Sequence, residues 1–337
     1  MFSAVSDGAT NPDLCCLMIM KDFIFPILSV FSSIACLGQQ DHSKNTDPLK
    51  AQFVTSDIPR FWAAFDSVGR APLRSREIYE ELYFNKGSFG LGIFKTAAIG
   101  TTEVFASKIE KYDKYYRSIR KNTLQVQDAV PAMRKSFQRL KELYPASVFP
   151  DVYIVIGSMG SGGRSMKEGL FLGADVNCAD ESSDFTNISP AFSNVLKSLT
   201  LDKMPVLVAH ELVHYQQNYS DTSKNLLSRA INEGSADFIC KLVTGTPVNH
   251  LLHQYGEQHE RELWLQFKAE LGRNDIQKWF YHPATESRPS DLGYYIGFKI
   301  TEAYYLRAKN KKKAIEEILN ISNFRSFLEK SGYGSNF

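Results

Sequence analysis

The sequence has little charge of one sign, few cysteines and no long apolar run, and each shortage excludes a class of protein. Its 39 basic and 37 acidic residues give a net charge of only +2, which argues against a nucleic-acid-binding protein. Only Cys178 and Cys240 follow the N-terminal segment. They permit one disulfide in an exported protein, and two small buried hydrophobic residues are the equally consistent alternative. The uncharged apolar residues 23–38 are too short to span a bilayer comfortably.

The apolar residues 23–38 instead indicate an export signal. We therefore expect a signal segment over residues 1–38, with Met20 as the alternative start of translation. Two kinds of processing stay open, namely cleavage after Gly38 and lipid attachment at Cys36, where residues 33–36 partly match the lipoprotein box. The expected location is the periplasm, the envelope or the exterior of a bacterium. Contact with a membrane is expected only through a lipid at Cys36.

One stretch has the pattern of a metal site, M-P-V-L-V-A-H-E-L-V-H-Y-Q-Q-N-Y over residues 204–219. His210 and His214 are four residues apart in an apolar run with helical period, so a helix would place both imidazoles on one face. Glu211 projects beside that face, where it can act as general base toward a water at a metal ion. Chance produces this pattern in roughly one chain of this length in a hundred. The alternative is a buried helix with two core histidines.

The segment that follows, residues 226–243, makes chance a weaker explanation. Glu233 comes after eighteen intervening residues, which is enough for a loop and a return helix. A third ligand on an antiparallel helix leaves the fourth tetrahedral position of zinc free for water, as a catalytic site requires. Asp237 is four residues further on the same helix face, where we expect it to accept a hydrogen bond from a ligand histidine.

These residues resemble the motif of the gluzincin metallopeptidases. The matching pattern is His210-Glu211-x-x-His214 followed by Asn232-Glu233-Gly234-x-x-Asp237. With residues 289–305, the chain also resembles a bacterial family described as predicted zinc-dependent proteases of unknown function, and more distantly the gliding-motility lipoproteins. The resemblance implies an α+β, predominantly helical fold. It also implies a small mixed sheet whose edge strand lies beside a two-helix zinc site.

The resemblance assigns roles to the residues of the motif. It implies one zinc ion per chain with His210, His214 and Glu233 as ligands and Glu211 as the base. Asn232 and Asp237 would support these ligands through hydrogen bonds.

The order of the chain predicts four regions. They are a signal segment (1–38), a polar tether (39–56), a helical region without visible chemistry (57–148) and the gluzincin-like region (149–337). Residues 152–156, V-Y-I-V-I, predict a buried strand, and residues 169–176 predict the next strand. The glycine-rich residues 158–163 between them predict a flexible loop. No Gly-Lys-Ser/Thr follows, so a phosphate-binding loop is excluded.

The resemblance also suggests where a peptide would bind. In gluzincins an edge strand pairs with an extended peptide, and this role falls on the segment around Gly173. An interior hairpin strand is the alternative for that segment. Arg288 is a candidate anchor for a substrate carboxylate.

A helix over residues 289–307 is the remaining informative segment. Gly293, Gly297 and Thr301 recur every four residues and form a flat stripe that allows close packing against another helix. In gluzincins a downstream Tyr or His stabilises the oxyanion, so Tyr294 or Tyr295 is the candidate, with packing as the alternative role for both.

The sequence thus supports two functions of different classes. The leading hypothesis is an exported zinc peptidase that acts on a peptide or protein. The alternative is a non-enzymatic envelope or motility-associated lipoprotein with a structural or vestigial metal site. Glu211 favours the peptidase, because a structural site has no need of it. A structural site usually closes its fourth position with Cys or His, and Cys240 lies two helical turns from Glu233.

Overall fold

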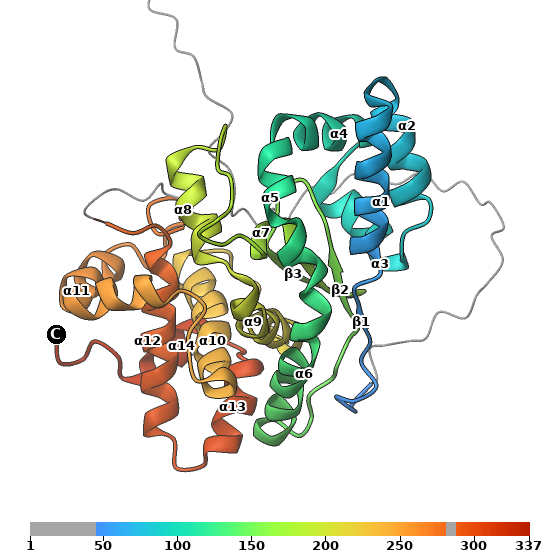
Figure 1. The fold of residues 1–337 in the computed structure, drawn as a ribbon. Coiled ribbons are helices and arrows are strands. Elements are labelled where there is room, and N and C mark those ends of the chain that lie inside the picture. Colours follow the sequence, from blue (N-terminus) through green and yellow to red (C-terminus); the bar gives the residue numbers. More distant parts are fainter. Residues whose placement is uncertain (1–44, 281–287) are drawn as a thin grey trace, which may run out of the picture.

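The computed structural model describes residues 45–280 and 288–337, which form a predominantly helical protein with one small mixed sheet (Figure 1). The predicted α+β class is confirmed. The predicted signal segment, with its alternatives at Met20, Cys36 and Gly38, lies outside the described residues. Within the described ranges, none of the helices combines the length and apolarity needed to cross a bilayer.

The strands are β1 (Phe53–Val54), β2 (Val152–Val155), β3 (Gly163–Met166) and β4 (Gly169–Gly173). The α-helices are α1 (Asp57–Arg70), α2 (Ser75–Tyr79), α3 (Phe89–Phe94), α4 (Thr102–Lys111), α5 (Asp113–Leu124), α6 (Val126–Leu143), α7 (Ala174–Asn177), α8 (Pro190–Ser198), α9 (Met204–Gln216), α10 (Leu226–Thr244), α11 (His250–Lys268), α12 (Leu292–Arg307), α13 (Lys311–Leu319) and α14 (Phe324–Ser331). Shorter 3-10 or π segments are η2 (Pro72–Arg74), η3 (Glu80–Phe84), η4 (Lys95–Ile99) and η5 (Leu201–Lys203).

The sheet has the order β1-β2-β4-β3, with β3 antiparallel to β4 and the other pairs parallel. Every residue of β2 and β4 is buried, as their β-branched and apolar side chains require. The placement of Gly173 on an edge strand is therefore wrong, because β4 lies between β2 and β3. The edge strands are β1 and β3, and β3 begins at Gly163, the last residue of the segment predicted to be a flexible loop.

Residues 45–56, the described part of the predicted tether, are ordered. The Phe149 N–H donates to the Asn45 carbonyl at 2.7 Å, and Asn45 Nδ2 donates back to the Phe149 carbonyl at 2.9 Å. Further along, β1 pairs in parallel with β2, with Phe53 opposite Val152. The prediction failed because a polar stretch can be ordered by backbone hydrogen bonds to the edge of a buried strand.

The N-terminal helices share one continuous hydrophobic core with the sheet and with the C-terminal helices. Buried aromatic rings of this region pack together, and two of their hydroxyls also donate to the backbone that directly follows β2. The Tyr83 hydroxyl donates to the Ile156 carbonyl at 2.6 Å, and Tyr116 donates to the Gly157 carbonyl at 3.0 Å. Both cysteines, Cys178 and Cys240, are free and buried, which confirms the alternative of two small buried residues.

Helices α10 and α12 are in backbone contact, as the small-residue stripe on α12 predicts. A Cβ atom on Gly297 would lie 1.7 Å from the Ala230 carbonyl oxygen, and one on Gly234 would lie 2.1 Å from the Phe298 nitrogen. Thr301 is buried and its hydroxyl donates to the Gly297 carbonyl at 2.8 Å. This contact fixes the start of α12 beside the middle of α10, where Glu233 lies.

Candidate metal centre

Two helices supply the residues of the predicted metal motif. Helix α9 has Pro205 in its first turn, where the missing N–H costs no helical hydrogen bond. Helix α10 begins with a capping box in which Asn225 and Ser228 each bond to the backbone of the other. In Figure 1, α9 lies between α10 and the sheet, at the centre of the molecule.

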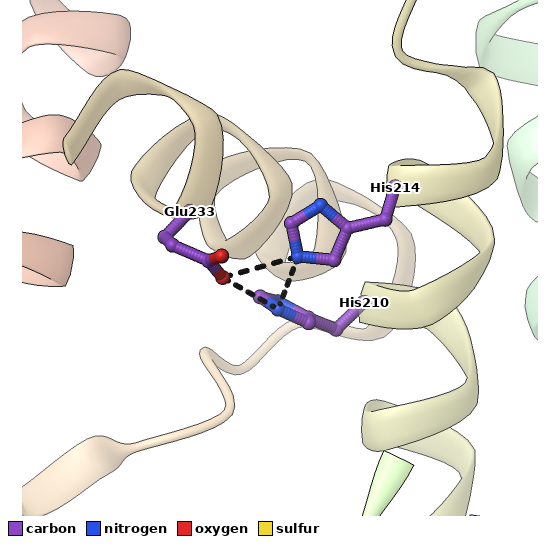
Figure 2. Close-up of side chains that lie close together, drawn as sticks. All are labelled: His210, His214 and Glu233. Carbon is purple, nitrogen blue, oxygen red and sulfur yellow. Dashed lines mark hydrogen bonds and ion pairs between the residues drawn. The ribbon is translucent and has the colours of Figure 1, made fainter. Parts of the chain in front are cut away.

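The side chains of His210, His214 and Glu233 point toward one another across α9 and α10 (Figure 2). The Nε2 atoms of the two histidines are 3.0 Å apart. Glu233 Oε2 lies 3.1 Å from Nε2 of His214 and 3.7 Å from Nε2 of His210. Glu233 is 1 % exposed and His210 is 5 % exposed, so the cluster is buried.

The geometry and chemistry of the cluster fit zinc. Donors around tetrahedral zinc are about 3.3 Å apart, given bond lengths of about 2.0–2.1 Å. The three distances between donor atoms in this cluster, 3.0, 3.1 and 3.7 Å, lie on both sides of this value. In the described ranges no further Cys, His, Asp or Glu joins the group. Three protein donors therefore leave one tetrahedral position for water or substrate.

The surroundings of Glu233 keep its carboxylate ionised. Burial alone would raise its pKa, but the adjacent His214 and the Arg229 guanidinium outweigh burial and hold the pKa well below its ordinary value. Arg229 is one turn earlier on α10, and its Nη2 lies 3.2 Å from Oε1 of Glu233. Since Arg229 contacts Oε1, the other oxygen, Oε2, faces the imidazoles.

Gln217 orients His214, a role that the sequence analysis did not assign. Its Oε1 lies 2.8 Å from Nδ1 of His214 and also accepts a hydrogen bond from Nδ2 of Asn232 at 2.7 Å. Its Nε2 donates to the Asn232 carbonyl at 2.7 Å. Asn232, predicted to support the ligands, thus supports His214 through Gln217. The signal in the sequence was the position of Gln217, three residues after His214.

Asp237 does not bond to a ligand histidine, contrary to the prediction. Its Oδ2 lies 2.7 Å from Nε2 of His253, and its Oδ1 accepts from the Val248 N–H at 2.7 Å. The reason is tertiary: the chain after α10 turns back and brings buried His253 on α11 against Asp237. Nδ1 of His210 is buried and has no hydrogen-bond partner within the described ranges.

Glu211, the predicted base, lies against the edge strand β3. A Cβ atom on Gly163 would come within 2.7 Å of Glu211 Oε1 and 3.1 Å of Leu207. Only glycine at position 163 leaves the carboxylate in this place. Glu211 is 4 % exposed, so it belongs to the same buried group as the metal-site residues.

The two candidate tyrosines have different surroundings. The Tyr294 ring stacks on His210 with centroids 6.3 Å apart, and the charge of Glu233 acts on its hydroxyl. Burial, followed by the charge of Glu233, raises the pKa of Tyr294 well above its usual range, so the phenol keeps its proton. Tyr295 points elsewhere and donates to Glu260 at 3.0 Å. Tyr294 is therefore the tyrosine at the metal centre.

Three other candidates contact different parts of the protein. Gly173 lies at the end of interior strand β4, where an added Cβ would meet the Ser161 carbonyl oxygen at 2.3 Å. The Arg288 guanidinium lies over the Trp279 ring at 5.4 Å. The Cys240 thiol donates to the Val206 carbonyl at 3.2 Å, and burial raises its pKa well above the usual value, so it stays a thiol.

Comparison with known proteins supports the zinc interpretation through a family match. No curated protein and no solved structure matches the chain. Residues 190–325 match the model of a family described as "Predicted Zn-dependent protease". The matched segment runs from α8 into the start of α14 and includes the histidine, glutamate and tyrosine residues of the metal centre. The match agrees with the resemblance that the His-Glu-x-x-His pattern and Glu233 carry in the sequence.

Proposed function

We propose that this chain hydrolyses peptide bonds as a zinc-dependent peptidase. The observation that carries the proposal is the convergence of His210, His214 and Glu233 on one point, with Glu211 next to the first ligand. Three protein ligands with one free position are typical of catalytic zinc. A buried structural zinc site would not require Glu211.

Each residue has a role in the proposed reaction. Zinc held by His210, His214 and Glu233 would polarise the scissile carbonyl and make water acidic. Glu211 accepts a proton from the attacking water and passes it to the leaving amine, so one amide and one water give a carboxylate and an amine. Tyr294, which keeps its proton, donates a hydrogen bond to the developing oxyanion.

The substrate peptide would pair with the free edge of β3 and not with the segment around Gly173. Strand β3 is an edge strand, and its Gly163 is the backbone position in contact with Glu211. Backbone hydrogen bonds to this edge would place an extended peptide beside the base.

The burial of Glu211 is the observation that favours the alternative function. At 4 % exposure, Glu211 meets substrate only after the surrounding elements separate. A non-enzymatic envelope or motility-associated protein, in which zinc holds α9 and α10 together, has no such requirement. The two functions differ in one measurable property, since only the peptidase needs Glu211.

The Glu211→Gln variant tests the proposal. Zinc content, measured by mass spectrometry of the purified protein, should stay at one per chain, and cleavage of a mixed peptide library should fall by about 100-fold or more. Wild-type cleavage should also stop with a chelator and return with zinc. Full zinc occupancy with no cleavage by the wild type would support the alternative function, and cleavage by Glu211→Gln equal to wild type would contradict the role of Glu211.

We also propose that the protein is exported in a bacterium, as a periplasmic, secreted or envelope-anchored protein. The support is the apolar segment over residues 23–38 and the partial lipoprotein box that ends at Cys36. Labelling with radioactive palmitate distinguishes the anchored form, because a Cys36→Ala variant would lose the label.

A further inference from the structure

The edge strand β3 carries an arginine that forms no ion pair with any residue the structure describes. Arg164 is the second residue of β3 and is half-buried. Its Nε is buried and makes no hydrogen bond, and within residues 45–280 and 288–337 its guanidinium forms no ion pair. By contrast, half-buried Arg229 pairs with Glu233. An arginine offers a planar fork of donors that matches a carboxylate, so this site is suited to an anion.

The electrostatics of the edge strand also favour the binding of an anion at Arg164. Burial lowers the pKa of Arg164, while the charge of Glu211 opposes this change. Removing a guanidinium from water without a partner is unfavourable. Glu211 attracts Arg164 without forming an ion pair with it. A substrate carboxylate that pairs with the guanidinium would therefore offset the free-energy cost of burying Arg164.

The register of β3 sets where that carboxylate would be. Gly163 faces α9 and Glu211, so strand alternation turns Arg164 to the opposite face. There it is opposite Phe171, whose ring stacks on those of Tyr153 and Phe94. Apolar neighbours of this kind strengthen an ion pair by lowering the local dielectric constant.

The side chains of a peptide that pairs with β3 alternate between the two faces of the sheet, as those of the strand do. Where one substrate residue lies over Glu211, the next one along presents its side chain to the face of Arg164. We propose that Arg164 binds the carboxylate of an Asp or Glu side chain within two residues of the scissile bond, and so selects acidic peptides. This inference rests on the proposed peptidase function.

The experiment uses matched peptides in which Glu or Gln stands at each of the two positions on either side of the cleaved bond. For wild type, kcat/KM should be about 10- to 100-fold higher for the Glu peptide at one position. In Arg164→Gln this ratio should fall to near one, and in Arg164→Glu the enzyme should favour Lys over Glu at that position. Arg117→Gln, which changes an exposed arginine paired with Asp113, is the control and should keep the wild-type ratio.

Binding without turnover separates this inference from the peptidase function. The zinc-loaded Glu211→Gln protein should bind the labelled Glu peptide about 10-fold or more tightly than the Gln peptide, by fluorescence anisotropy. Adding Arg164→Gln should abolish the difference. If the wild type cleaves nothing but this difference is seen, the peptidase function fails and the anion site stands. Equal affinities for both peptides overturn the inference, whether or not cleavage occurs.

Two measurements guard against a folding defect in the variants. Arg164→Lys keeps the charge and should retain part of the preference for Glu. In the wild type itself, the Glu/Gln ratio should decline as salt rises, because mobile ions screen the pair. A ratio that does not change with salt or persists in Arg164→Gln would contradict a role for the guanidinium.

Discussion

The carboxamide oxygen of Gln217 lies 2.8 Å from Nδ1 of His214 and fixes the proton of that imidazole. With the proton on Nδ1, Nε2 carries a lone pair directed at Glu233 and His210. The amide cannot easily rotate, since its oxygen also accepts from Asn232 and its nitrogen donates to the Asn232 carbonyl and to the Ser235 hydroxyl. The end of α9 and the middle of α10 thus hold one ligand in the tautomer that a metal requires.

Replacing Gln217 by Leu should weaken zinc binding by about 10- to 100-fold, because loss of an outer hydrogen bond to a ligand histidine has effects of this size. Competition with a chromophoric chelator measures this change independently of catalysis. Gln217→Glu keeps an acceptor and should retain most of the affinity. Gln254→Leu makes the same chemical change at an exposed residue of α11 and should have no effect. An unaltered zinc affinity in Gln217→Leu would show that Gln217 does not orient the ligand.

Gly163→Ala should lower catalysis while leaving the fold and the zinc content intact. The new Cβ would lie 2.7 Å from Glu211 Oε1, which is the end of a flexible side chain and can move at small cost to stability. Moving the base by this much should reduce kcat/KM by about 10- to 100-fold. Gly92→Ala is a suitable control, because a Cβ there meets no atom within 4 Å. The free energy of unfolding should change by less than about 1 kcal/mol in both variants.

The cluster of three candidate ligands could be predicted from sequence because its geometry is mostly local. A four-residue spacing on one helix fixes the relative positions of His210 and His214 before any tertiary contact forms. To reach these histidines, Glu233 requires only that the next helix run back antiparallel to α9. The edge strand β3 could not be predicted in the same way. Its residues G-R-S-M include no β-branched or aromatic side chain, so it becomes a strand only by pairing with β4.

The errors around the metal centre have a common physical origin. The prediction for Asp237 used only the face of its own helix, but a partner for a buried carboxylate can come from any element that packs there, in this case His253 from α11. Gln217 is the residue after the end of α9, so its spacing of three from His214 suggests proximity to that histidine but does not fix the direction of its side chain. The choice between Tyr294 and Tyr295 also depended on packing, since the contact of α12 with α10 sets the rotation of α12.

Tyr294→Phe should reduce kcat by about 100-fold or more without loss of zinc, because it removes a donor for the oxyanion. The raised pKa of Tyr294 also predicts the pH profile. Deprotonation of this phenol begins at higher pH than for an ordinary tyrosine, whose pKa is about 10. Its titration therefore cannot cause a decline of activity below about pH 10, and the variant should keep the alkaline limb of the wild-type profile. Tyr295→Phe, which removes a bond to Glu260, should retain the wild-type kcat.

Gly297→Ala should destabilise the protein and separate the two helices that hold Tyr294 at the metal centre. The added Cβ would lie 1.7 Å from the Ala230 carbonyl oxygen, and this backbone atom cannot move aside as a side chain can. Overpacking of this kind costs about 1–3 kcal/mol, which should lower Tm by about 2–5 °C in a protein of this size. Gly69→Ala, also in a helix, meets no atom within 4 Å and should leave Tm unchanged or slightly raised.

The Gly297→Ala variant should also affect catalysis. Helix α12 must shift in this variant, so the distance from Tyr294 to His210 should increase and kcat should fall. Zinc binding should persist, because α9 and α10 supply all three ligands. Loss of zinc together with activity would instead show that α12 sets the position of Glu233 itself.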